Sequence, residues 1–323
     1  MKVVMGAGFA WSPVSGAVNI PNIDGLYFFY QRTIYLENLC QPAAWWANPS
    51  LLSPIDKVTV FTSNAGLIGR QYTISSVRVA LPINQKMDIG FGVTGTGTTE
   101  GSSLSAGNGG AQYSSNFNFN LPSLEAGASY TPPVGGNIGA LFITGTESVP
   151  DPSNSGLNTV YFFWGFGAGW LSPSVMNTVK FSISTISVYH SQFITWWDNC
   201  AKTGILINAK DGGLIGSLEY GFSLFNGPVS FFQNKSNFHG YETIKGCISL
   251  KMMGIAGILL GYSNDSPPAN AIDNNGATYH AGIELRRSTI YPYYGGYEFG
   301  ISTAHSISII HRIWIGYSFI KKS

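Results

Sequence analysis

Residues that could do chemistry are few and scattered in this chain. The five histidines show neither His-x-His nor His-Glu-x-x-His spacing, so they form no recognisable metal-binding motif. No Gly-x-Ser-x-Gly turn is present that would expose a nucleophilic serine. Asp265, Asp273, Asn274 and Asn275 lie in one loop, but they lack the regular spacing and final Glu of a calcium loop, which favours turn chemistry. We therefore expect no enzyme activity, no metal site and no cofactor.

Ionisable residues instead fall on one face of segments that alternate with period two. Around residue 220 the alternation sets Leu218, Tyr220, Phe222 and Leu224 against Ser217, Glu219, Gly221 and Ser223. A β-strand directs successive side chains to opposite faces, so this segment predicts one apolar and one polar surface. His280, Glu284 and Arg286 share the polar face of another such segment, and we expect His280 and Glu284 to hydrogen bond. Glu219, His280, Glu284 and Arg286 are therefore candidate polar lining residues.

The scarcity of charge indicates which solvent the apolar face meets. The chain has 17 Lys and Arg and 16 Asp and Glu among 323 residues, or 10% charged, whereas soluble domains have about 25%. No uninterrupted apolar run reaches the roughly 20 residues that a membrane helix needs. Short alternating segments with one apolar face are instead typical of membrane β-barrels. The net charge of +1 gives no electrostatic reason to expect nucleic acid as a partner.

The number of alternating segments predicts the size of the barrel. About fourteen or fifteen can be marked, and bacterial single-chain barrels use even numbers. We predict an all-β fold: a single closed antiparallel transmembrane β-barrel of about 14 strands over residues 56–320. Residues 1–55 lack sustained alternation and form a separate N-terminal segment. Gly95–Gly110 is interpreted as a surface loop, and a change of apolar phase between Ile183 and Ile186 predicts a β-bulge.

The N-terminus and the cysteines add little. Val3–Trp11 is weakly apolar and is followed by small residues, so a signal peptide is weak or missing in this chain. Cys40, Cys200 and Cys247 can form at most one disulfide, and the sequence leaves open whether any pair forms. We expect them to be small buried residues rather than redox or metal-binding groups.

A family resemblance begins at Asn48-Pro49-Ser50-Leu51-Leu52-Ser53. This segment precedes a predicted strand at Lys57–Thr62, which Gln71–Leu81 and Ile89-Gly90-Phe91-Gly92 follow. The order resembles the early segment and first hairpin of PorV/PorQ-like proteins, distant relatives of the FadL transporters. The resemblance implies a fourteen-stranded barrel in the bacterial outer membrane, with the N-terminal segment in or against the lumen. It also implies that Asn48 and Pro49 are an architectural motif.

Three functions remain open at this point. The main hypothesis, implied by the resemblance, is a PorV/PorQ-like accessory of transport or type IX protein secretion. An alternative is a FadL-like channel for hydrophobic small molecules. The expected partners are outer-membrane lipids and either secretion-system components or a hydrophobic solute. A β-rich surface adhesin or filament subunit is a further alternative, but it leaves the scarcity of surface charge unexplained unless subunits cover that surface.

Overall fold

The computed structural model describes residues 45, 48–52, 57–68, 72–99, 117–150, 158–191, 196–209, 213–226, 239–253, 255–266, 276–286, 292–302 and 308–319. These residues form a 3-10 helix and fourteen strands. The elements are η2 (Pro49–Leu52), β1 (Thr59–Ile68), β2 (Tyr72–Asn84), β3 (Met87–Thr99), β4 (Phe117–Tyr130), β5 (Asn137–Pro150), β6 (Asn158–Leu171), β7 (Val179–His190), β8 (Trp196–Asn208), β9 (Leu214–Asn226), β10 (His239–Met253), β11 (Ala256–Ser266), β12 (Gly276–Leu285), β13 (Tyr293–Ser302) and β14 (Ser308–Ser318).

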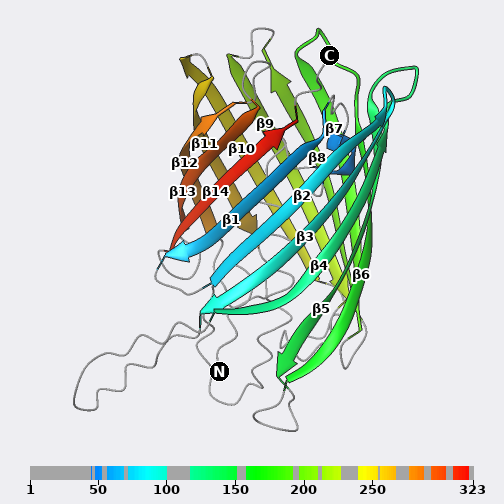
Figure 1. Cartoon of the computed structure of the whole chain (residues 1–323), viewed down its shortest axis with the longest axis vertical. Coiled ribbons are helices and arrows are strands. Elements are labelled where there is room, and N and C mark those ends of the chain that lie inside the picture. Colours follow the sequence, from blue (N-terminus) through cyan, green and yellow to red (C-terminus); the bar gives the residue numbers. More distant parts are fainter. Residues whose placement is uncertain are drawn as a thin grey trace, which may run out of the picture.

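The fourteen strands close into one antiparallel barrel (Figure 1). Each strand pairs with its neighbours in sequence, and β1 pairs with β14 in a register that places Thr59 opposite Ser318. The closed sheet has no free edge, because the first and last strands satisfy each other's backbone groups. The predicted fold class and strand number are confirmed.

The barrel has two unlike ends. Connections such as 85–86 and 254–255 are short, and we call the end that carries them the short-turn end. The opposite end carries the longest connections, 100–116 and 227–238, and we call it the loop end. The arrowheads of β1, β3 and β5 lie at the loop end, at the bottom of Figure 1.

Strand β4 runs through Pro122, although proline cannot donate a ladder hydrogen bond and usually marks the end of a strand. Pro122 lies where the β3–β4 register shifts, between the pairs Thr96–Asn120 and Thr94–Ser123. The β4–β5 ladder begins only at Leu124, so no ladder requires the N–H group that proline lacks. The connection after β3 also begins later than the expected loop at Gly95–Gly110, because β3 extends to Thr99.

The predicted bulge in β7 was also wrong. Strand β7 pairs with β6 and with β8 without a register shift. Phe181 and Ile183 are exposed on the outside, whereas Ile186 and Val188 are buried on the inside. The inner side chains fit because β6 offers Gly165 and Gly167 beside them: a Cβ atom at Gly167 would lie 3.2 Å from Ile186 Cγ1. The apolar side chains thus change from the outer to the inner face of β7 while the backbone register continues.

Exposed side chains of the barrel wall are predominantly apolar. On β9 the two classes alternate, with exposed Leu218, Tyr220 and Phe222 and buried Ser217, Glu219 and Gly221. The same outward apolar face recurs on β3, β6, β10, β12 and β14. Among the residues that the structure describes, no helix is long and apolar enough to cross a membrane.

Tyr220 provides a test of the outer face. It lies at the middle of β9 and is 42% exposed, while its neighbour Glu219 is only 8% exposed. Tyr220→Arg should strongly reduce membrane assembly, because an arginine on the lipid face near the midplane costs about 2–4 kcal/mol. Tyr220→Phe is the matched control and should assemble normally. Folding into vesicles can be followed by migration of unboiled protein in SDS gels, and equal assembly of both variants would contradict the outward placement.

Candidate functional site in the barrel lumen

The first residues of the segment around η2 start its 3-10 turn. Asn48 precedes the helix, and its side-chain Oδ1 accepts hydrogen bonds from the Ser50 N–H (3.1 Å) and the Ser50 hydroxyl (2.7 Å). Pro49 occupies the first helical position, where its fixed φ suits a helix and its missing N–H is not needed. The Leu51 N–H then donates to the Asn48 carbonyl (3.0 Å). Asn48 and Pro49 thus start the turn that the following residues complete.

This segment lies inside the barrel, against β3, β4, β5 and β6. Trp45, Asn48, Ser50 and Leu52 are each at most 2% exposed. The Asn48 side-chain amide also donates to the Ser182 hydroxyl of β7 (2.7 Å), which joins positions 134 residues apart in sequence. We call the described residues 45 and 48–52 the inner segment.

Four glycines on consecutive strands make room for the inner segment. A Cβ atom at Gly90 or Gly127 would lie 2.9 Å from a side-chain atom of Leu52 or Trp45, respectively. At Gly139 it would overlap the Pro49 carbonyl carbon, and at Gly169 the Asn48 Oδ1. Each glycine lies two or three residues from the short-turn end of its strand. We call these four residues the glycine seat. Without a Cβ atom, they let the strand backbone and the inner segment come closer than any other residue would allow.

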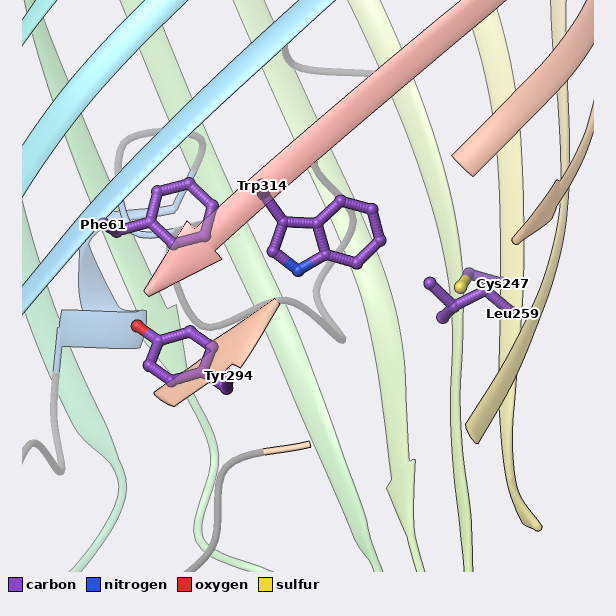
Figure 2. Packing of buried hydrophobic residues seen from close by; sticks show 5 residues of the cluster. All are labelled: Phe61, Cys247, Leu259, Tyr294 and Trp314. Carbon is purple, nitrogen blue, oxygen red and sulfur yellow. The ribbon is translucent and has the colours of Figure 1, made fainter. Parts of the chain in front are cut away.

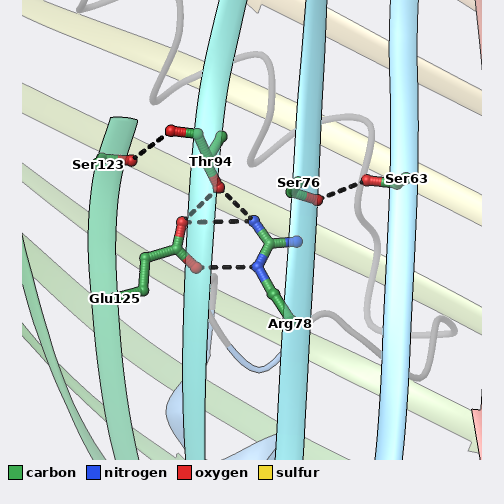
Figure 3. A network of polar contacts seen from close by, with 6 residues as sticks. All are labelled: Ser63, Ser76, Arg78, Thr94, Ser123 and Glu125. Atoms are coloured by element: carbon green, nitrogen blue, oxygen red, sulfur yellow. Dashed lines mark hydrogen bonds and ion pairs between the residues drawn. The ribbon is translucent and has the colours of Figure 1, made fainter. Parts of the chain in front are cut away.

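A buried polar network lies immediately beside the glycine seat (Figure 3). The Arg78 Nε on β2 donates to Glu125 Oε2 on β4 (2.9 Å), and both side chains are at most 1% exposed. Thr94 of β3 donates to Glu125 Oε1 (2.7 Å) and accepts from Arg78 Nη2 (3.2 Å). The ion pair crosses β3 at Gly92, where a Cβ atom would lie 2.7 Å from Glu125 Oε2. Its three members bind each other, as buried charges require.

Aromatic rings cover the inner wall where the barrel closes, on β1, β13 and β14 (Figure 2). Phe61 of β1 and Tyr294 of β13 stack with ring centroids 6.5 Å apart, and Trp314 of β14 belongs to the same buried cluster. Tyr294 lies over Gly316 and Trp314 over Gly296, each directly opposite in the β13–β14 register. These rings therefore lie along the wall rather than across the lumen.

The predicted polar residues of β9 and β12 alternate with exposed apolar neighbours, and their role as lumen-lining residues stays a prediction. Glu219 is buried and lies directly opposite Lys245 of β10. Glu284 pairs with Arg286 (2.8 Å), and both contact the Ser249 hydroxyl of β10. His280 lies beside Gly300 of β13, where a Cβ atom would be 2.9 Å from its Nδ1. The expected hydrogen bond between His280 and Glu284 stays a prediction.

Sequence reasoning missed the contacts that join distant strands. Arg78 and Glu125 are 47 residues apart, and nothing in the local pattern links them or links Ser182 to Asn48. Within the described part of the chain, Cys200 and Cys247 form no disulfide, and Cys40 lies outside the described residues. In the described part of the chain, no cluster of His, Cys, Asp and Glu residues could hold a metal ion.

Comparisons with known proteins place this architecture among solved outer-membrane barrels. No protein-family model matches the chain, and no curated protein does either. The CymD monoaromatic hydrocarbon channel is 11% identical with a TM-score of 0.60, over 86% of this chain and 93% of that one. A FadL homologue from Pseudomonas aeruginosa is 12% identical with a TM-score of 0.55, over 87% and 94%. The toluene transporter TodX from Pseudomonas putida is 12% identical with a TM-score of 0.52, over 85% and 93%. At these identities the likeness shows the fold alone, and the chain shares the closed β-barrel fold of these three proteins.

Proposed function

We propose that this protein is a channel of the bacterial outer membrane for small hydrophobic solutes, and that its N-terminal segment closes the lumen near the short-turn end. The observation that carries the proposal is the inner segment on its glycine seat. Each of the four strands β3 to β6 has a glycine on its inner face near the short-turn end, and residues 45 and 48–52 occupy the space that larger side chains would fill. A barrel that only anchored a protein in a membrane would have no need of a fitted internal segment.

The division of the chain into two functional parts follows from this arrangement. Residues 1–55 would be the N-terminal closing segment, with Asn48 and Pro49 shaping its end, and residues 56–320 the transmembrane barrel. The outward apolar face supports the membrane placement, because side chains such as Phe162 and Ile283 are 65% and 66% exposed. Water would solvate such a wall poorly, whereas lipid matches it.

The inner wall supports the choice of a hydrophobic solute. Phe61, Tyr294 and Trp314 give the inner wall aromatic side chains, and Cys247 and Leu259 belong to the same buried apolar cluster. Ionic groups on the inner wall, such as Arg78 with Glu125 and Arg312 with Glu298 (3.2 Å), are paired with each other. Paired charges attract an ionic solute weakly, so an uncharged apolar solute fits this wall best.

Protein secretion is a second candidate, supported by the PorV/PorQ-like sequence around Asn48 and Pro49. In that case the barrel would hold secretion components at the membrane rather than pass a solute. A role as adhesin or filament subunit is disfavoured, because the closed sheet offers no edge for strand addition between subunits.

Uptake across the outer membrane separates these functions. We expect host cells that lack hydrocarbon channels to take up radiolabelled toluene severalfold faster when they carry this protein. Uptake of a hydrophilic solute of similar size should not change. Equal acceleration of both solutes would indicate a general porin. Acceleration of neither, together with co-purification of secretion components, would contradict the proposal and favour the secretion function.

A further inference from the structure

Five ionisable residues lie at the middle of their strands, on the face turned away from the exposed side chains. Each is within one residue of the strand centre: Lys202 of β8, Glu219 of β9, Lys245 of β10, Glu298 of β13 and Arg312 of β14. Lys202 is half-buried and the other four are buried. We call these five residues the charged belt. Because the sheet is closed, an ion that crosses the barrel through its inside must pass this level.

Positive charge exceeds negative charge in the charged belt. Arg312 pairs with Glu298, with Nη2 and Oε2 3.2 Å apart. Lys245 lies directly opposite Glu219, and Lys202 is a further cation that acts on Lys245. Three cations therefore meet two carboxylates. The buried ion pair of Figure 3 has one charge of each sign, so it does not offset the excess.

The cations of the charged belt act on each other between separate parts of the wall. Three strands separate β10 from β14, yet Lys245 interacts electrostatically with Arg312. The Arg312 guanidinium is held by Glu298 and by the ring of Trp314, whose centroid lies 4.6 Å from its central carbon. Two such cations repel each other, and an anion between them would be attracted by both.

A buried hydroxyl group lies beside these charges. Ser217 is two residues before Glu219 on the same face of β9, and it is a diagonal neighbour of Lys245 in the β9–β10 register. It is only 8% exposed, and its Oγ has no hydrogen-bond partner among the described residues. Buried polar atoms are normally hydrogen bonded, so this hydroxyl needs a partner. A hydroxyl can donate to an anion, as a lysine ammonium group does.

We infer that the charged belt lines the lumen, binds small inorganic anions such as chloride, and makes the ion current of the barrel anion-selective. Basic side chains around a pore favour anions. The surrounding wall of low dielectric constant strengthens the field of the excess charge. An uncharged solute would pass the belt, whereas potassium ions would be repelled. The inference goes beyond the channel function for hydrophobic solutes, but it rests on the path through the lumen proposed above.

The reversal potential in planar bilayers under a potassium chloride gradient tests this inference. The measurement uses the full chain and its Gly139→Ala variant, whose inner segment should leave the wall and allow a larger current. We expect both to pass chloride severalfold better than potassium. In the Gly139→Ala background, Lys245→Gln should reduce this preference and Glu219→Gln should increase it, because they remove opposite charges. Ser217→Ala should reduce it without a change of charge.

Lys86→Gln is the matched control, because it removes one positive charge from an exposed turn between β2 and β3. It should leave the selectivity unchanged. If Lys245→Gln does not fold, Lys202→Gln should reduce the preference in its place. Equal permeability of the two ions, a preference for potassium, or no ion current through folded barrels would overturn the inference. Equal selectivity of the Lys245, Glu219 and Lys86 variants would do so as well. Toluene uptake does not depend on these charges, so it tests the channel function separately.

Discussion

Gly139→Ala should raise the ion conductance of the barrel by displacing the inner segment from the lumen wall. A Cβ atom at this position would overlap the Pro49 carbonyl carbon and lie 2.5 Å from its oxygen. These are backbone atoms, so no rotamer change relieves the overlap, and either η2 or β5 must move. Because β5 is paired along its length with β6, we expect the inner segment to move.

Displacement would remove several favourable contacts together. The Asn48 amide would lose Ser182, and the buried side chains of Trp45 and Leu52 would lose their places beside Gly127 and Gly90. Burial of a large apolar side chain contributes about 1.5–3 kcal/mol. Loss of these contacts would therefore remove most of the free energy that holds the inner segment against the barrel wall.

Single-channel recordings in planar bilayers would measure the effect. The unmodified protein should show low conductance and Gly139→Ala a much higher one, with migration of unboiled protein in SDS gels showing that the barrel has formed. Gly216→Ala is the matched control. Gly216 is also a buried strand glycine, but a Cβ atom there would meet nothing closer than the Cys247 carbonyl oxygen at 3.7 Å. Equal conductance of a folded Gly139→Ala barrel and the control would contradict closure by the inner segment.

The sequence was informative where the determining signal is local. Alternation assigns each side chain to a face, because the pleat has a period of two whatever the neighbouring strands are. It therefore placed Tyr220 outside and Glu219 inside, and the spacing of the segments indicated a fourteen-stranded barrel. The same signal misled at Ile186, where the apolar side chain changes face while the backbone register continues.

Features that depend on strand neighbours could not be predicted in this way. Gly90 and Gly216 look alike as strand glycines, and only the packing of Leu52 and Trp45 against Gly90 distinguishes them. Pro122 marks a strand end by its chemistry, but the register shift opposite Thr94 accommodates it within β4. The pairing of Arg78 with Glu125 arises because Gly92 lets two side chains meet across the strand between them.

That pairing provides the second prediction with a large effect. Glu125→Gln keeps the side-chain shape but removes the negative charge facing Arg78, whose side chain is 0% exposed. The guanidinium would remain buried with only neutral partners, and breaking a buried ion pair in this way costs about 3–5 kcal/mol. The barrel should therefore unfold at a clearly lower denaturant concentration.

Two further variants test whether the unpaired buried charge of Arg78 causes the loss of stability. The double variant Arg78→Met, Glu125→Leu removes both charges, so it should recover much of the stability that Glu125→Gln loses. Glu284→Gln breaks an ion pair whose side chains are 12% and 14% exposed, and water can solvate the remaining Arg286. Its loss should be smaller for that reason. The stabilities of Glu125→Gln, the double variant and Glu284→Gln can be compared by guanidinium chloride unfolding of barrels refolded in the same vesicles. A double variant no more stable than Glu125→Gln would contradict this explanation.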